Sequence, residues 1–376
     1  MFDYADRRRR LGERMRTDGV ELVFIPPSAD LEYLTGVPRA IPTFGQSQYA
    51  HGWVAGAFIA PERTDPVFVI PRMMSLFEMA GELPGEVVVV NESDDGPELF
   101  AKAARGFGRA TTLGIGDRTW GETVIQLLDA VAPERVVPVS RFVNELRRTK
   151  SPEELEVMQR ACAVCDETMA AVAPRVQPGA TMLELVEEVE HQMRLHGSRV
   201  ASFTTHAFTH FVGGKNSDEE TRTDPIVEGD VVMFDFGAVV DGYCSDFGRT
   251  VCVGEPDPEV RETHDLVLAA QEAGRAALRP GTLASEVNRI CRRPIEEAGY
   301  GYAFKHRMGH GIGLDVHERP FVSEEEETPL EVGMTFTDEP SILLDRFGVR
   351  TEDVVVCEPN GGRTLNTFPP DLILNG

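Results

Sequence analysis

Two stretches of this chain, about a hundred residues apart, open long helices in the same way. Residues 151–154 read Ser-Pro-Glu-Glu and residues 257–260 read Asp-Pro-Glu-Val, so each puts proline in the first helical turn behind a capping side chain. Each predicted helix stops at a Pro-Gly pair, at residues 178–179 and 280–281, and a second helix and then strands follow in both copies. The pattern predicts a duplicated helix-helix-sheet unit, with two halves related by a pseudo-twofold and a site between them.

The chain before this unit alternates helix and strand. An amphipathic helix at residues 4–18 precedes an apolar strand at 21–25, and further strand-like and helical patterns lead to a short basic helix at 141–148. Since 376 residues exceed what one hydrophobic core usually serves, we expect two domains in a chain of the α/β (α+β) class. The expected division is an α/β domain at residues 1–150 and the duplicated unit at residues 151–376.

The acidic composition narrows the range of partners. The formal charge is −25 and the pI is near 4.8, which disfavours nucleic acids and anionic membranes because like charges repel. No apolar run reaches the length needed to span a bilayer. The six cysteines are scattered through helix and strand patterns rather than set in a secreted disulfide framework. We therefore expect a cytoplasmic protein that binds neither nucleic acid nor membrane.

One predicted hairpin carries two carboxylates. Asp241 and Gly242 form its two-residue turn, because the glycine tolerates the positive φ that such turns need. Counting outward from the turn puts Asp246 opposite Gly237 and on the same face as Asp235, so the two carboxylates are diagonal neighbours roughly 7 Å apart. Two such groups in a half-buried sheet are costly without a cation, whereas two that face solvent are unremarkable.

Three further residues of the second half are candidate metal ligands. His310 lies among three glycines, and imidazole is a common ligand of transition metals. Glu339 and Glu352 each adjoin an apolar, strand-like run. Taken singly, a histidine in a glycine-rich segment is more often structural, and such acids are more often surface residues. His306 and His317 also compete with His310 for any role.

Together these segments resemble the pita-bread metallopeptidase family, which includes Xaa-Pro dipeptidases, Xaa-Pro aminopeptidases and methionine aminopeptidases. The site motifs read FDFG at 234–237, SDFGRT at 245–250 and GHGIG at 309–313. Outside the site, residues 33–36 read YLTG and residues 145–154 read ELRRTKSPEE, similar to the N-terminal segment and domain junction of the family. The resemblance implies a creatinase-like N-terminal α/β domain followed by a pseudo-twofold pita-bread catalytic domain.

The resemblance also implies a metal centre. It would hold two divalent ions, Mn²⁺ foremost with Co²⁺, Zn²⁺ or Fe²⁺ as alternatives, on five ligands: Asp235, Asp246, His310, Glu339 and Glu352. The family pattern gives Asp246 and Glu352 as the bridging ligands. Glu339 is also implied to be catalytic, as the shuttle that carries a proton to the leaving nitrogen.

The substrate side is less complete. The resemblance implies that His317 is catalytic, steadying the substrate carbonyl as negative charge develops, and that Arg350 lies on the substrate side. Prolidase-like relatives carry a substrate-binding histidine in the segment after the position of Gly214, and this chain has none there. His206 and His210, just upstream, are the candidates to replace it.

The resemblance implies a hydrolase that cuts the Xaa-Pro bond of dipeptides or short peptides through a hydroxide bridging two metal ions. Because one segment is altered, a metal-dependent hydrolase or lyase of a small zwitterion, similar to ectoine hydrolases or dimethylsulfoniopropionate lyases, stays open. Asp338, where an apolar residue is usual, adds an acid beside the predicted metals and favours that alternative. The third hypothesis, a catalytically silent binding protein, is disfavoured because carboxylates crowded without metal destabilise a fold. A homodimer is also implied by the resemblance.

Overall fold

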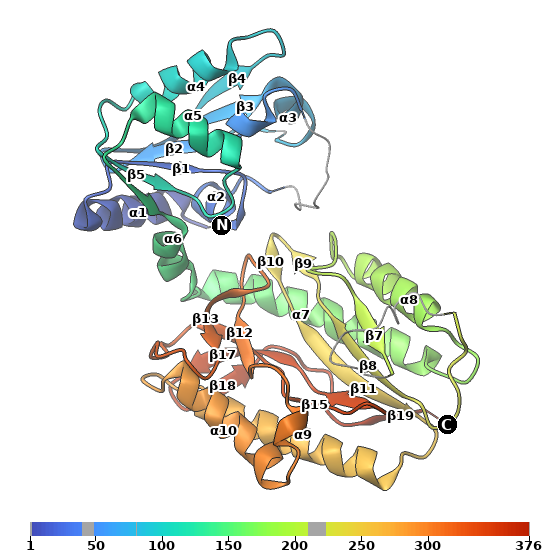
Figure 1. Ribbon diagram of the computed structural model, residues 1–376. Coiled ribbons are helices and arrows are strands. Elements are labelled where there is room, and N and C mark those ends of the chain that lie inside the picture. Colours follow the sequence, from blue (N-terminus) through green and yellow to red (C-terminus); the bar gives the residue numbers. More distant parts are fainter. Residues whose placement is uncertain (1, 40–48, 80, 210–222, 376) are drawn as a thin grey trace. The chain divides into compact units, whose positions relative to one another are not determined.

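The computed structural model contains two compact units, Met1–Arg147 and Arg148–Gly376 (Figure 1). It describes residues 2–39, 49–79, 81–209 and 223–375. Within these ranges, no helix combines the length and the apolarity that crossing a membrane requires.

The N-terminal unit is built on a six-stranded sheet ordered β4-β3-β2-β1-β5-β6. The strand β1 pairs antiparallel with β2 and parallel with β5. All four residues of β1 are buried, so both faces of the sheet are covered. The strands are β1 (Leu22–Ile25), β2 (Gly56–Ala60), β3 (Arg63–Pro71), β4 (Glu86–Val90), β5 (Thr112–Ile115) and β6 (Arg135–Pro138).

Helices cover this sheet (Figure 1). They are α1 (Tyr4–Asp18), α2 (Ala29–Thr35), α3 (Arg72–Phe77), α4 (Gly96–Arg105), α5 (Gly121–Val131) and α6 (Ser140–Arg147), with a 3-10 turn at Gly52–Val54. Phe100 of α4 and Leu127 of α5 join Phe24 and Phe58 of the sheet in one buried cluster. The predicted helix at residues 4–18 is confirmed by α1.

The first half of the C-terminal unit packs two helices on a four-stranded sheet ordered β19-β11-β8-β7. Its helix α7 begins with a capping box, in which the Ser151 hydroxyl accepts from the Glu154 N–H and the Glu154 carboxylate accepts from the Ser151 N–H. The elements are α7 (Pro152–Val172), α8 (Met182–Leu195), β7 (His206–Phe208), β8 (Val231–Phe236), β9 (Val239–Val240), β10 (Tyr243–Cys244), β11 (Phe247–Val253) and β19 (Ile373–Asn375).

The second half repeats this order around its own buried cluster. Two helices again precede a sheet, here five-stranded and ordered β13-β12-β14-β17-β18. The elements are α9 (Pro258–Ala277), α10 (Ala284–Glu297), β12 (Gly309–Gly311), β13 (Glu318–Val322), β14 (Thr335–Asp338), β15 (Ser341–Leu343), β16 (Gly348–Arg350), β17 (Asp353–Glu358) and β18 (Gly361–Thr364), with a 3-10 turn at Gly301–Ala303. A 3-10 turn at Ala173–Arg175 follows α7 in the first half. The predicted helix-helix-sheet duplication is therefore present.

The imidazole of His264, on α9, is buried in this second core. His264 is 2% exposed, and its Nε2 lies 3.5 Å from the Thr351 hydroxyl oxygen. Burial lowers the pKa of His264 from 6.5 to about 4, because the charged ring would lose its hydration. The folded protein therefore keeps this ring neutral where an unfolded chain would protonate it.

We predict that His264→Gln makes the protein less sensitive to acid. A lowered pKa in the folded state contributes stability above pH 6.5 that is lost as the pH falls towards 4. The gap between the two pKa values corresponds to about 3 kcal/mol. Urea unfolding of wild type and variant between pH 7 and pH 4 measures the difference, and parallel curves for the two proteins would contradict the prediction.

Candidate metal centre

The hairpin that joins β8 to β11 has the predicted register. Tyr243 lies opposite Val240, and the same register holds at Phe247, opposite Phe236. Both turn residues adopt the positive φ that a two-residue turn requires. The hairpin prediction is therefore confirmed, and it places Asp246 across from Gly237.

Gly237 is required by the space around it. A Cβ at this position would lie 2.1 Å from the carbonyl oxygen of Ser245 and 2.1 Å from the hydroxyl of Ser202. No side chain fits there unless the backbone moves. The strand thus carries Asp235 next to a position that only glycine can fill.

A backbone pairing joins the two halves of the unit at this point. Gly248 of β11 pairs with Asp235 of β8 on one side. On the other side, its N–H donates to the Glu352 carbonyl at 3.2 Å and its carbonyl accepts from the Glu352 N–H at 3.0 Å. Since paired residues in adjacent strands point to the same face, the carboxylates of Asp235 and Glu352 flank a residue that has no side chain.

Arg249 stabilises the pairing between Gly248 and Glu352 from within the protein interior. Its side chain is 1% exposed and donates to the carbonyl of Glu352 at 2.8 Å and to the carboxylate of Asp353 at 2.7 Å. Further donors reach the carbonyls of Phe368 and Pro369. The guanidinium therefore fixes the segment that carries Glu352 against β11.

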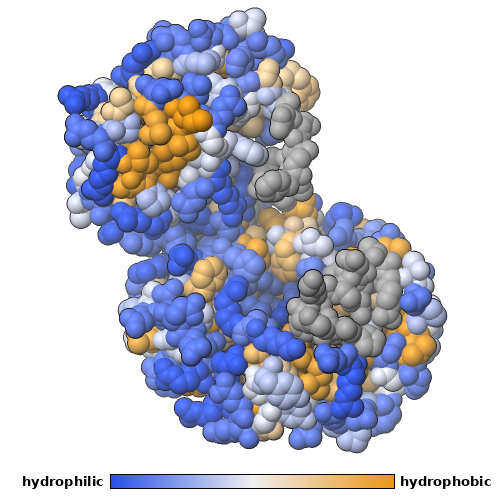
Figure 2. Space-filling view, viewed as in Figure 1, coloured by the Kyte–Doolittle hydropathy of each residue, from blue (hydrophilic) through white to orange (hydrophobic). Residues whose placement is uncertain are grey.

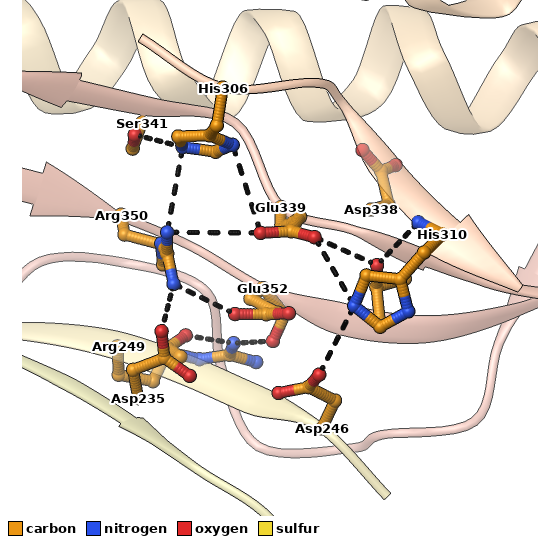
Figure 3. A network of polar contacts seen from close by, with 12 residues as sticks. Asp235, Asp246, Arg249, His306, His310, Asp338, Glu339, Ser341, Arg350 and Glu352 are labelled. Atoms are coloured by element: carbon orange, nitrogen blue, oxygen red, sulfur yellow. Dashed lines mark hydrogen bonds and ion pairs between the residues drawn. The ribbon is translucent and has the colours of Figure 1, made fainter. Parts of the chain in front are cut away.

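His310, on β12, and Glu339, at the end of β14, approach the same place (Figure 3). The Nε2 of His310 lies 3.4 Å from an oxygen of Asp246 and 3.5 Å from an oxygen of Glu339. Its Nδ1 lies 3.0 Å from the Gly311 carbonyl and donates a hydrogen bond to it, so Nε2 is the nitrogen that faces the carboxylates and that could bind a cation once it is deprotonated. The structure thus brings the five predicted ligands together.

The donor set fits a divalent cation. Asp246, His310 and Glu352 each offer one atom, and these atoms lie within 4.8 Å of one another. The second oxygen of Asp246 is buried and has no hydrogen-bond partner among the described residues. Burial and, to a smaller extent, the neighbouring carboxylates raise the pKa of Asp246 to about 6, against the lowering effect of His310, and they raise the pKa of Glu352 well above its usual range. Hard oxygen ligands that repel one another suit divalent ions, so metal binding here stays a prediction with this support.

Arg350 lies among these acids. Its guanidinium contacts Asp235 and lies 3.5 Å from an oxygen of Glu352 and 3.7 Å from an oxygen of Glu339 (Figure 3). The predicted role on the substrate side remains a prediction. What the structure adds is that Arg350 is a counter-charge to three of the four carboxylates.

The histidines around the centre differ in position. The ring of His317 meets the ring of His310 edge to face at 4.1 Å between centroids. His306, for which no definite role was predicted, has its Nε2 2.5 Å from the Ser341 hydroxyl oxygen. Its Nδ1 lies 3.8 Å from an oxygen of Glu339. The only signal for His306 was its place in the same motif, four residues before His310.

Of the two candidates to replace the missing substrate histidine, His206 and His210, the structure describes only His206. His206 begins β7 and lies opposite Asp235 in the sheet, next to the carboxylates. His210 lies outside the described residues. A substrate contact by either one stays a prediction.

Asp338 does not join the site. Its side chain points away from the carboxylates (Figure 3) and lies against Gly274 of α9. It is fully buried, and neither oxygen has a hydrogen-bond partner within the described ranges. Burial raises its pKa well above the usual range. The expectation that Asp338 adds an acid beside the predicted metals is wrong, because side chains alternate along a strand and Glu339 takes the inner face.

A buried ion pair supports the turn before His317. Lys150 Nζ lies 3.0 Å from a carboxylate oxygen of Glu318, and these side chains are 2% and 1% exposed. The other oxygen of Glu318 accepts from the N–H of Asp315 at 3.2 Å. The turn that carries His317 is thus fixed by Lys150, two residues before α7, through a contact between distant segments that sequence patterns do not predict.

We predict that Mn²⁺ stabilises the protein through this centre. A ligand that binds only the folded state adds about 2.7 kcal/mol per site at a hundredfold excess over its Kd. Asp246→Asn should remove most of this gain, because it deletes a charge shared by the centre. Asp241→Asn is the matched control, since it makes the same change at the exposed turn of the same hairpin. Urea unfolding with and without Mn²⁺ measures the effect, and an equal gain in both variants would contradict the assignment.

Comparison with known proteins agrees with this architecture. Residues 156–359 match metallopeptidase family M24, and residues 7–149 match the creatinase/prolidase N-terminal domain. A Xaa-Pro dipeptidase of Pyrococcus furiosus is 30% identical over 98% of this chain and 99% of its own length. Among solved structures, a prolidase from Thermococcus sibiricus has a TM-score of 0.88 at 28% identity and covers 100% of both chains.

A dipeptidase PepE from Mycobacterium ulcerans has a TM-score of 0.83 at 30% identity, with 99% of both chains covered. The predicted resemblance and the predicted fold class are therefore confirmed. The chain belongs to metallopeptidase family M24 and joins the pita-bread domain of that family to an N-terminal domain of the creatinase/prolidase type.

Proposed function

We propose that this metallopeptidase hydrolyses the Xaa-Pro bond of dipeptides or short peptides with two divalent ions, Mn²⁺ foremost. The observation that carries the proposal is the meeting of four carboxylates and His310 from both halves of the C-terminal unit (Figure 3). Relatives that match almost the whole chain are named Xaa-Pro dipeptidases, which supports the choice of substrate.

Five side chains would hold the ions. Asp235 would serve one ion and His310 with Glu339 the other, with Asp246 and Glu352 available to both. If all four carboxylates are ionised, Arg350 leaves an excess of three negative charges, which two divalent cations can neutralise. When bound, such a pair supplies a water of lowered pKa and polarises the scissile carbonyl.

Glu339 is the proposed proton carrier. Burial alone would raise its pKa, but the positive charges of His310 and Arg350 hold the pKa below its usual range. The carboxylate is therefore ionised at neutral pH and can accept a proton from the attacking water. Passing that proton to the leaving nitrogen completes its role as general base and then general acid.

His317 is the proposed donor to the substrate carbonyl. Although the residue is exposed overall, partial burial of the ring, together with the charge of a protonated His310, lowers the pKa of His317 to about 4. The ring is neutral at pH 7 and offers one N–H to an oxygen on which negative charge develops. Its edge-to-face contact with His310 places the ring beside that proposed ligand.

Cleavage of a small zwitterion was the alternative suggested by the altered segment and by Asp338. Since Asp338 is buried against α9 and away from the carboxylates, it shapes no substrate wall. No described residue now favours that alternative over the peptide substrate, and the experiment below separates the two.

We predict that the Mn²⁺-loaded protein cleaves Ala-Pro and Gly-Pro, and that Asp246→Asn lowers kcat/KM at least about a hundredfold. The loss follows because the variant removes one ligand charge that the proposed ion pair shares. Asp241→Asn should retain wild-type rates. Release of free proline, followed by chromatography, is the measurement.

Two outcomes would overturn the proposal. Equal activity of the Asp246 and Asp241 variants would show that the cleavage does not come from this centre. Inertness of wild type towards both dipeptides, with an Asp246-dependent reaction on an amide-containing osmolyte, would establish the zwitterion alternative instead.

We also propose a homodimer in the cytoplasm. Apolar side chains are exposed on the N-terminal unit, including Ile125 and Leu128 of α5 and Val136 of the edge strand β6, and Figure 2 shows apolar surface gathered on that unit. A second copy would cover such a surface.

The six cysteines, all buried thiols, fit a reducing compartment such as the cytoplasm. Sedimentation equilibrium should give twice the mass of 41.4 kDa, and a monomer at micromolar concentration would contradict the dimer.

A further inference from the structure

One buried hydroxyl lies between two of the predicted metal ligands. Thr337, on β14, places its hydroxyl oxygen 3.0 Å from the backbone nitrogen of His310 and 3.1 Å from Oε1 of Glu339. The side chain shares a face of the strand with Glu339, because residues two apart in a strand point the same way. A hydroxyl that contacts both ligands can set how they lie relative to each other.

The single hydrogen of the hydroxyl fixes the direction of both hydrogen bonds. The backbone N–H of His310 can only donate, so the Thr337 oxygen accepts from it. The hydroxyl hydrogen then remains for Oε1 of Glu339, which accepts. A hydroxyl that donates to an ionised carboxylate forms one of the stronger hydrogen bonds found in proteins. The three groups thus form one directed chain, from the backbone of one ligand to the side chain of the other.

The backbone of β12 is irregular where it meets this hydroxyl. Its register against β13 shifts between His310 and Gly311, and Gly311 pairs with Phe336 of β14. At this point the N–H of His310 is donated to a side chain instead of a strand carbonyl. Gly309 permits the close approach, because a Cβ there would lie 2.0 Å from the Thr337 carbonyl oxygen.

The same hydroxyl opposes a competing attraction on Glu339. One oxygen of that carboxylate lies 3.7 Å from the Arg350 guanidinium, and the other lies 3.5 Å from Nε2 of His310 (Figure 3). The oxygen beside the imidazole is the one that accepts from Thr337. Without the hydroxyl, the guanidinium would draw the carboxylate away from the imidazole with which it is proposed to share an ion.

We propose that Thr337 is a positioning residue for the ion assigned to His310 and Glu339. The inference rests on the proposed function, because it concerns how one of the two proposed ions is held. Hydrogen-bond partners of metal ligands commonly contribute about 10- to 100-fold to metal affinity. The effect should fall on this ion rather than on the ion assigned to Asp235, because the hydrogen bonds of Thr337 reach the first pair of ligands.

The test is a calorimetric titration of the metal-free protein with Mn²⁺. Wild type should bind two ions. Thr337→Val keeps the shape of the side chain but removes the hydroxyl, and it should bind one ion about 10- to 100-fold more weakly. Thr337→Ser retains the hydroxyl and should bind both ions as wild type does. At saturating Mn²⁺, Thr337→Val should also lower kcat for Ala-Pro with little change in KM.

Thr335→Val is the matched control. Thr335 lies two residues earlier on the same face of β14, and its hydroxyl donates to the Ile312 carbonyl at 2.5 Å. The two threonines are 1% and 0% exposed, so the variants remove equally buried hydroxyl groups. Urea unfolding of the metal-free variants should show similar losses of stability, whereas Thr335→Val should keep both Mn²⁺ affinities.

Three outcomes would overturn the proposal. They are wild-type Mn²⁺ binding by Thr337→Val, an equal weakening in Thr335→Val, and a Thr337→Ser variant that binds as weakly as Thr337→Val. The titration needs no substrate, so it tests Thr337 even where the protein cleaves neither Ala-Pro nor Gly-Pro. Conversely, unchanged Mn²⁺ binding by Thr337→Val together with Asp246-dependent cleavage would reject the role of Thr337 and leave the proposed function standing.

Discussion

The backbone pairing of Gly248 with Glu352 is the constraint on which the centre depends. It joins a strand of the first half to a segment of the second, and Gly248 pairs with Asp235 on its other side. Three adjacent strands thus set two carboxylates on one face with a glycine between them. Each half has its own helices and its own buried cluster. Each half therefore packs around its own core, whereas the predicted metal ligands come from both halves.

The second constraint is electrostatic. Four buried carboxylates cannot all stay ionised without cations, and the raised pKa values of Asp246 and Glu352 express that cost. Arg350 offsets part of it from within, while Arg249 holds the surrounding backbone without touching the carboxylates of the centre. Natural sequences accept such local instability where the site needs it and recover stability elsewhere, here in two well-packed cores.

Turn, capping and periodicity patterns in the sequence predicted much of this fold. They did not predict the contacts between segments that are distant in the chain. The Asp241-Gly242 turn specified the register of a whole hairpin, because a two-residue turn leaves only one way to count outward. The Gly248–Glu352 pairing spans a hundred residues and has no local signal. For Asp338 the prediction itself was wrong. Asp338 and Glu339 are adjacent in sequence, and adjacent residues of a strand point to opposite faces, so the two acids do not share the site.

The placement of the acids on two halves also orders events during synthesis. Asp235 and Asp246 are made about a hundred residues before Glu352, an interval on the order of ten seconds at usual translation rates. During that interval the hairpin lacks the segment that would close around its carboxylates, so they remain hydrated and hold cations only weakly. The complete ligand set can therefore bind cations only after the two halves have docked. Cation binding then stabilises a chain that has already folded.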